Sequence, residues 1–116
     1  MFSDTDDILS MAFNASRDAV CRHLHVREGA IGRDAVLSTL GASPRPVILA
    51  RQVLMILLRD TFGCSFGEIA RKTGISGRRV MSNVSNARWA VRNDPLCADI
   101  HDTAKSVLND YGKRTE

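Results

Sequence analysis

The stretch that decides the fold covers residues 66 to 80, Phe66-Gly67-Glu68-Ile69-Ala70-Arg71-Lys72-Thr73-Gly74-Ile75-Ser76-Gly77-Arg78-Arg79-Val80. Gly74 can take the left-handed backbone conformation that a tight turn between two helices needs. Ala70 is small enough for the helices to cross closely. Ile69, Ile75 and Val80 are spaced to fill the small core between them. The pattern predicts a helix-turn-helix.

The flanking residues give this prediction its boundaries, 65–93. Ser65 and Glu68 have the spacing of a capping box, which begins the first helix and carries it to about Thr73. Ser76 can cap the second helix, 77–93. Val84, rather than its neighbour Asn83, continues the apolar side of that helix. Its first turn then carries Arg78 and Arg79, where a recognition helix meets base edges and phosphates.

The helical period continues on both sides of this motif. An N-terminal helix is expected at about 4–25, from the stripe Ile8, Ala12, Ala15, Ala19, Val20 and Leu24. Residues 14–16 could break it. With little else to bury its apolar stripe, this helix could cover the core or form a homodimer.

Three further helices are expected. A short one at 34–40 would end at Gly41, and the loop 42–46 with its two prolines would follow. A strongly apolar helix at 46–62 has the composition of a central, buried element, and Gly63 should end it. Asp94 and Pro95 can begin a last helix that runs from Leu96 to about Tyr111, with a frayed tail at 112–116. The expected fold is one all-α domain, 1–116, a five- to six-helix orthogonal bundle.

The net charge of +3 is unevenly distributed. Residues 51–93 contain eight basic and two acidic side chains, whereas the segments before and after are slightly acidic. A local positive excess of this kind suits a polyanion partner, although a solvated helix face would look the same by charge alone.

The run Ala50–Asp60 followed by Cys64–Ala70 resembles the C-terminal DNA-binding domain of the replication initiator DnaA. That resemblance extends over about 20–108 and implies the fold shared with the Trp repressor. It also implies an arginine before the long helix that enters the minor groove, which only Arg45 or Arg51 could supply here. The family's Asp-His-Thr signature is missing from Gly74–Val80, so recognition of the DnaA box is not expected.

The sequence therefore predicts a non-enzymatic regulator of transcription or replication that binds double-stranded DNA, with the recognition helix 77–93 in the major groove. Arg78 and Arg79 are expected to reach bases in the major groove. Arg71, Lys72, Arg88 and Arg92 are expected to contact phosphates, and Ser76 and Ser82 could donate hydrogen bonds to phosphate. The full set of predicted DNA-binding residues is Arg45, Arg51, Arg71, Lys72, Ser76, Arg78, Arg79, Ser82, Asn83, Arg88 and Arg92. The alternative is a protein-interaction adaptor that keeps the helix-turn-helix shape and has lost DNA binding. A Trp-repressor-like ligand sensor is a smaller third option.

Other groups of residues give weaker indications of function. The sequence contains no phosphate-binding loop and no catalytic set, and it identifies no cofactor or small-molecule ligand. Cys21, His23 and His25 alternate along a helix, so they are not expected to converge on a metal. Trp89 could stack on a base, but on the later turns of the recognition helix it is expected in the core or in a dimer contact. With no membrane-spanning stretch, the chain is expected to be cytoplasmic and nucleoid-associated.

Overall fold

The structure is a computed structural model that describes residues 4–38 and 42–114. The described residues form six α-helices: α1 (Asp4–Leu24), α2 (Arg33–Leu37), α3 (Arg45–Ile56), α4 (Phe66–Thr73), α5 (Gly77–Asn93) and α6 (Pro95–Arg114). A 3-10 turn at Glu28–Ala30 and a π-helical turn at Leu57–Thr61 complete the regular structure. The all-α prediction is confirmed. Gly41, the expected end of the short helix, lies outside the described residues.

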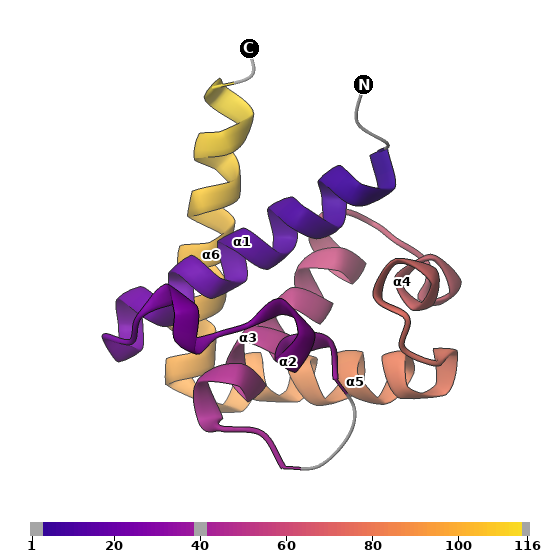
Figure 1. Cartoon of the computed structure of the whole chain (residues 1–116), viewed down its shortest axis with the longest axis horizontal. Coiled ribbons are helices and arrows are strands. Elements are labelled where there is room, and N and C mark those ends of the chain that lie inside the picture. The colour runs from indigo at the N-terminus through magenta and orange to yellow at the C-terminus, as the bar shows by residue number, and fades with distance from the viewer. Residues whose placement is uncertain (1–3, 39–41, 115–116) are drawn as a thin grey trace.

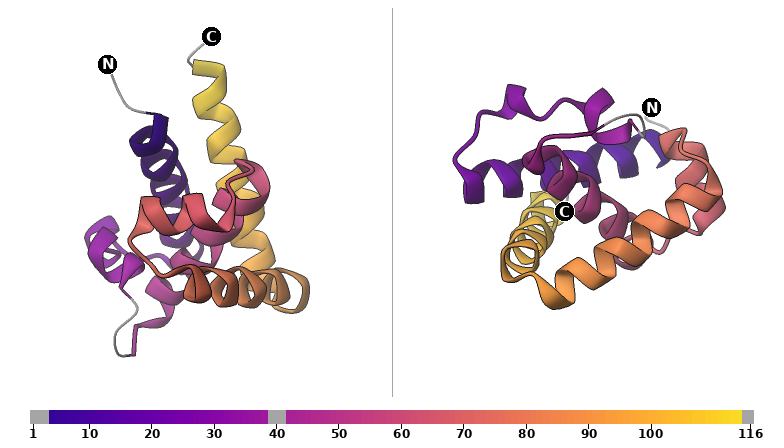
Figure 2. Two further views of the ribbon diagram at one scale, coloured as in Figure 1. Left: turned by 90° about the vertical axis from the view of Figure 1, so that its right-hand side faces the viewer. Right: turned by 90° about the horizontal axis from the view of Figure 1, so that it is seen from below.

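Helix α3 is the centre of the molecule, as its composition predicts. α1 crosses it on one side and α5 packs against it on the other, while α6 rises from the end of α5 beside α1 (Figure 1). The interior side chains of α3, such as Val53, Leu54 and Met55, are completely buried. α3 therefore holds α5 in place along one edge of the bundle (Figure 2).

Helix α1 covers the core. Ala12, Ala15 and Ala19 are fully buried, and these small side chains let α1 approach α3 and α6 closely. The possible break at residues 14–16 does not occur. The Ser16 hydroxyl donates a 2.8 Å hydrogen bond to the carbonyl of Ala12, so this buried polar group is satisfied without leaving the helix.

Three helix ends differ from their predicted positions. The short helix expected at 34–40 ends at Leu37, where the extended backbone of Ser38 follows. The long helix expected at 46–62 becomes α3 plus a π-helical turn, in which the Phe62 amide bonds to the Leu57 carbonyl at 2.9 Å. Gly63, with a φ of 69°, ends this turn. At the C-terminus, α6 continues to Arg114, so the tail expected from Gly112 is wrong for residues 112–114. Across 4–38 and 42–114, no helix has both the length and the apolar character to cross a bilayer.

Candidate nucleic-acid interface

Helix α4, the turn 74–76 and α5 have the local structure that the sequence predicts. Ser65 and Glu68 form a capping box, with the Glu68 amide donating to the Ser65 hydroxyl at 3.1 Å and the Ser65 amide to the Glu68 carboxylate at 3.2 Å. The hydrogen bond from the Ser65 amide, followed by the effect of the Ser65 hydroxyl, lowers the pKa of the Glu68 carboxyl. Gly74 ends α4 with a φ of 75°, the left-handed conformation expected of it.

The turn is also held by a buried hydroxyl that the sequence pattern did not predict. Thr73 donates a 2.7 Å hydrogen bond to the carbonyl of Ile69 and accepts one of 3.2 Å from the amide of Ile75. Threonine back-bonding to the preceding turn is common in helices. Here the same hydroxyl reaches forward as well, so it ties the end of α4 to the turn that leads into α5.

The small core between α4 and α5 fixes the rotation of α5 about its axis. Ile69, Ile75 and Val80 are buried, as predicted, and Val84 continues the apolar side into the bundle. Asn83 is half-buried on the flank of the helix. Because these residues face inward, the opposite side of α5 faces solvent along its whole length.

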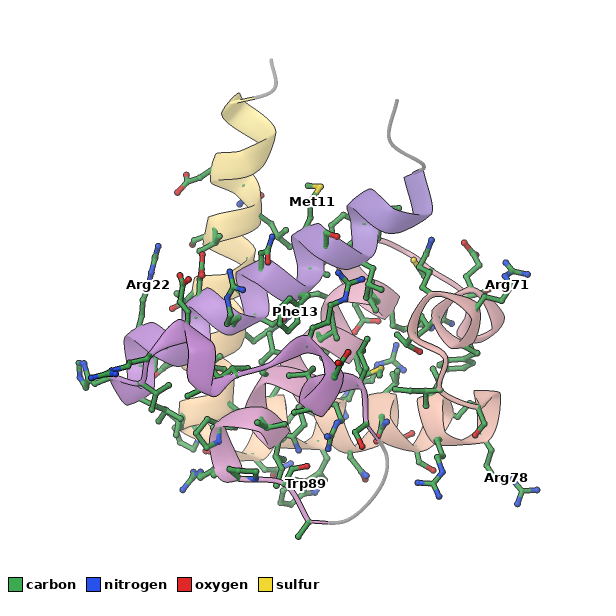
Figure 3. All side chains as sticks on the ribbon, viewed as in Figure 1. Met11, Phe13, Arg22, Arg71, Arg78 and Trp89 are labelled. Carbon is green, nitrogen blue, oxygen red and sulfur yellow. The ribbon has the colours of Figure 1, made fainter. Side chains whose placement is uncertain are left out.

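The solvent side of α5 is lined by five residues at three- to four-residue spacing, which we call the α5 row: Arg78, Ser82, Ser85, Trp89 and Arg92. All are exposed. Arg78 and Trp89 extend from the lower edge of α5, away from the other helices (Figure 3). Within 4–38 and 42–114, no side-chain hydrogen bond or ion pair involves the guanidinium of Arg78 or Arg92. No acidic residue occurs anywhere in α5.

The exposure of Trp89 excludes the core as its place, and the expected dimer contact stays a prediction. Its side chain is on the surface, and the residue is 66% exposed. Val80, Val84 and Ala87 determine which side of α5 is buried, and Trp89 lies on the other side. The side-chain amide of Asn93 donates a 2.8 Å hydrogen bond to the backbone carbonyl of Trp89, and the indole takes no part in this contact.

Arg51 lies in a setting unlike that expected of a DNA contact. Its guanidinium donates to the carbonyls of Val36 and Ala35 at 2.7 and 2.9 Å and to the hydroxyl of Ser43 at 3.2 Å. Burial lowers the pKa of this guanidinium. Arg51 therefore fastens the segment before α3 onto that helix.

Arg88 is also engaged within the protein. It forms a two-pronged ion pair with Asp60 of the π-helical turn, with distances of 2.7 and 3.4 Å. The hydrogen bond to Asp60 raises the pKa of Arg88. Arg88 would have to give up this carboxylate to contact a phosphate.

The remaining predicted residues occupy three places. Arg45 begins α3 beside the end of α5, where its guanidinium lies 3.9 Å from the Asp94 carboxylate. Arg71 is exposed on α4 and extends away from the lower edge of α5 (Figure 3), and Lys72 is half-buried. Ser76 caps α5 by accepting a 3.4 Å hydrogen bond from the Arg79 amide.

The histidine and cysteine side chains form no metal-binding group among the described residues. No group of three histidine, cysteine or acidic side chains there could hold a metal ion. His23 instead forms a 2.8 Å hydrogen bond with Thr103, which joins α1 to α6. Cys21, Cys64 and Cys97 are free. Burial and the nearby Asp94 raise the pKa of the Cys97 thiol to about 11.

Comparison of the chain with protein-family models, curated proteins and solved structures finds no match. The resemblance to the DnaA domain therefore stays a prediction from the sequence.

Proposed function

We propose that this chain is a non-enzymatic protein that binds double-stranded DNA and regulates transcription or replication by occupying its site. The observation that carries the proposal is the α5 row. It places arginine and small polar side chains on one exposed side of a helix that contains no acid and is held rigidly by α3 and α4.

The dimensions of α5 suit the major groove of DNA, which admits one α-helix. Arg78 and the neighbouring Arg79 are exposed in its first turn, which is where recognition helices reach base edges. Arginine can donate two hydrogen bonds to guanine. The Ser82 hydroxyl is one turn further and can donate to a base or a phosphate.

The proposed phosphate contacts come from the ends of this surface. Arg92 closes the α5 row, and Arg45 lies beside the end of α5. Each phosphate contact releases counterions from the DNA. Removing one such contact should therefore make the plot of log binding constant against log salt concentration less steep by about 0.9. Arg51 and Arg88 are left out of the proposed contacts, since each donates a 2.7 Å hydrogen bond to the protein itself, whereas the exposed Arg45 lies 3.9 Å from Asp94.

The test compares two double variants with the same change in charge. Arg78→Glu/Arg79→Glu alters α5, whereas Arg22→Glu/Arg27→Glu alters two exposed arginines at and after the end of α1 (Figure 3 labels Arg22). Binding is measured by fluorescence anisotropy on a labelled duplex selected from a random pool with the unaltered protein. We expect the α5 variant to lose about a hundredfold in affinity and the control to lose only a few-fold.

A duplex that binds both variants equally well would contradict the proposal. If the unaltered protein selects no duplex even at about 50 mM salt, where phosphate contacts are strongest, the chain is not a DNA-binding protein, and the adaptor alternative gains.

A further inference from the structure

Trp89 is the most exposed large apolar residue among those described, and it is the only tryptophan in the chain. Burying an indole is strongly favourable, so a tryptophan left on the surface costs hydrophobic stabilisation that the fold could have used.

The position of Trp89 joins it to the proposed DNA contacts. Trp89 follows Arg78 by eleven residues, which is about three helical turns, so the two side chains project from the same line of α5 about 16 Å apart. The residues around it on the helix are Ser85, Asn86, Arg92 and Asn93, all of them polar or basic. Along α5 itself, the neighbours of the indole are therefore hydrogen-bonding groups and a positive charge.

We infer that Trp89 is part of the DNA interface and contacts the sugar-phosphate backbone, an inference that rests on the proposed function. The ring would pack against a deoxyribose, and the indole N–H would donate a hydrogen bond to a phosphate oxygen. Tryptophan suits such a boundary because one end of its side chain is apolar and the other is a donor. Arg92, one turn further, would neutralise a neighbouring phosphate.

The geometry of α5 favours the backbone over the bases at this position. α5 has 17 residues and is therefore about 25 Å long. The major groove winds around the duplex, whereas the helix is straight. When the first turn of α5 reaches base edges, the last turns leave the groove and meet a strand.

A second copy of the chain fits this surface poorly. A two-fold contact through the α5 row would bring together two helices that carry four arginines each and no acid. Large exposed apolar residues in the described part of the chain are limited to Ile48, Met81 and Trp89. A stable dimer interface buries about 800 Å² on each partner around an apolar core. The polar surface around Trp89 provides no such core.

The experiment uses Trp89 as its own reporter. The unaltered protein is titrated with the selected duplex, and the anisotropy of the labelled DNA and the quenching of tryptophan by acrylamide are measured on the same samples. We expect the indole emission to shift to shorter wavelength and the quenching constant to fall by about half or more as DNA binding saturates, because the exposed ring becomes covered.

Three variants test separately what the indole ring, the indole N–H and the charge of Arg92 contribute to DNA binding. Trp89→Ala should weaken binding by about tenfold or more with an unchanged salt slope. Trp89→Phe keeps an aromatic ring and loses the N–H donor, so its affinity for the duplex should lie between those of Trp89→Ala and the unaltered protein. Arg92→Ala should flatten the salt slope by about 0.9. Asn109→Ala, at an exposed site on α6, is the control and should leave both quantities unchanged.

Two results would overturn the inference while leaving DNA binding intact. One is saturation of the anisotropy with no change in acrylamide quenching. The other is a fall in quenching when protein concentration rises without DNA, which would assign the indole to a contact between copies. Absence of any anisotropy change would instead remove the proposed function, and this inference with it.

Discussion

The guanidinium of Arg51 reaches from the middle of α3 to two carbonyls of the α2 segment and to Ser43. The resemblance to the DnaA domain implies a minor-groove arginine before the long helix, and Arg51 was predicted as one of the two residues that could supply it. Its partners lie 8 to 16 residues earlier in the chain, so only the folded structure brings them together. Arg51 therefore uses its guanidinium to bind backbone carbonyls of the protein itself.

Replacing Arg51 should reveal this difference. We expect Arg51→Ala to lower the free energy of unfolding by about 2 kcal/mol, because two backbone carbonyls lose a charged donor. The measurement is urea denaturation, with Arg22→Ala as a control that should remain close to the unaltered protein. A stable Arg51→Ala protein with a flattened salt dependence of DNA binding would instead make Arg51 a phosphate contact.

Arg88 and Asp60 show the same limit of sequence reasoning. They are 28 residues apart, and their ion pair depends on the π-helical turn that presents Asp60 to α5. A pattern of charges along the chain cannot reveal such a pair, because it is formed by packing between elements. A core position for Trp89 was wrong for a related reason: helical periodicity alone did not say how α5 would rotate against α3.

At the level of elements, the local signals were sufficient. The capping box at Ser65, the left-handed Gly74 and the cap at Ser76 each depend on residues within four positions of one another, and all three are confirmed. Asp94 likewise begins α6, where its carboxylate accepts a 3.0 Å hydrogen bond from the Leu96 amide. The π-helical turn was not predicted, since the sequence there continues the apolar pattern of α3.

The two glycines of α4 and its turn should respond oppositely to alanine. Gly74 has a φ of 75°, where a Cβ is strained, so Gly74→Ala should cost about 1–2 kcal/mol of stability. Gly67 lies in the first turn of α4, and a Cβ there would have only the Ser65 hydroxyl as a neighbour, at 4.0 Å.

Gly67→Ala should therefore stabilise the protein by roughly 0.5 kcal/mol, since alanine favours a helix. Thermal and urea unfolding of both variants provide the measurement. Destabilisation of similar size at the two positions would show that the left-handed turn is not the cause.

The molecule as a whole is held together by contacts between its two ends. α1 packs along α6, so residues from the first and last helices share one core with α3. His101 is part of this assembly: burial lowers its pKa, and the neighbouring Lys105 lowers it further, against smaller opposite effects of Asp102 and Asp60. Its Nε2 atom is buried with no hydrogen-bond partner among the described residues.

Global stability should therefore depend on pH through His101. The unfolded chain binds a proton near pH 6.5, whereas the folded protein resists protonation at that pH, so the free energy of unfolding should fall as the pH drops below about 6.5. Denaturation between pH 5 and pH 8, a range in which histidine titrates, provides the measurement. His101→Gln should reduce this dependence, and His25→Asn, at an exposed position, should leave it. An equal dependence of the unfolding free energy on pH in all three proteins would show that His101 is not its source.

The division of α5 into a buried side and the α5 row has a consequence for how the protein could change over time. Residues that hold the fold and residues that would choose a target occupy different positions of the same helix, with no overlap between the two sets. Substitutions in the row are free of the cost of repacking a core. A lineage, or a combinatorial library, could therefore acquire new binding preferences at these five positions while inheriting the scaffold unchanged.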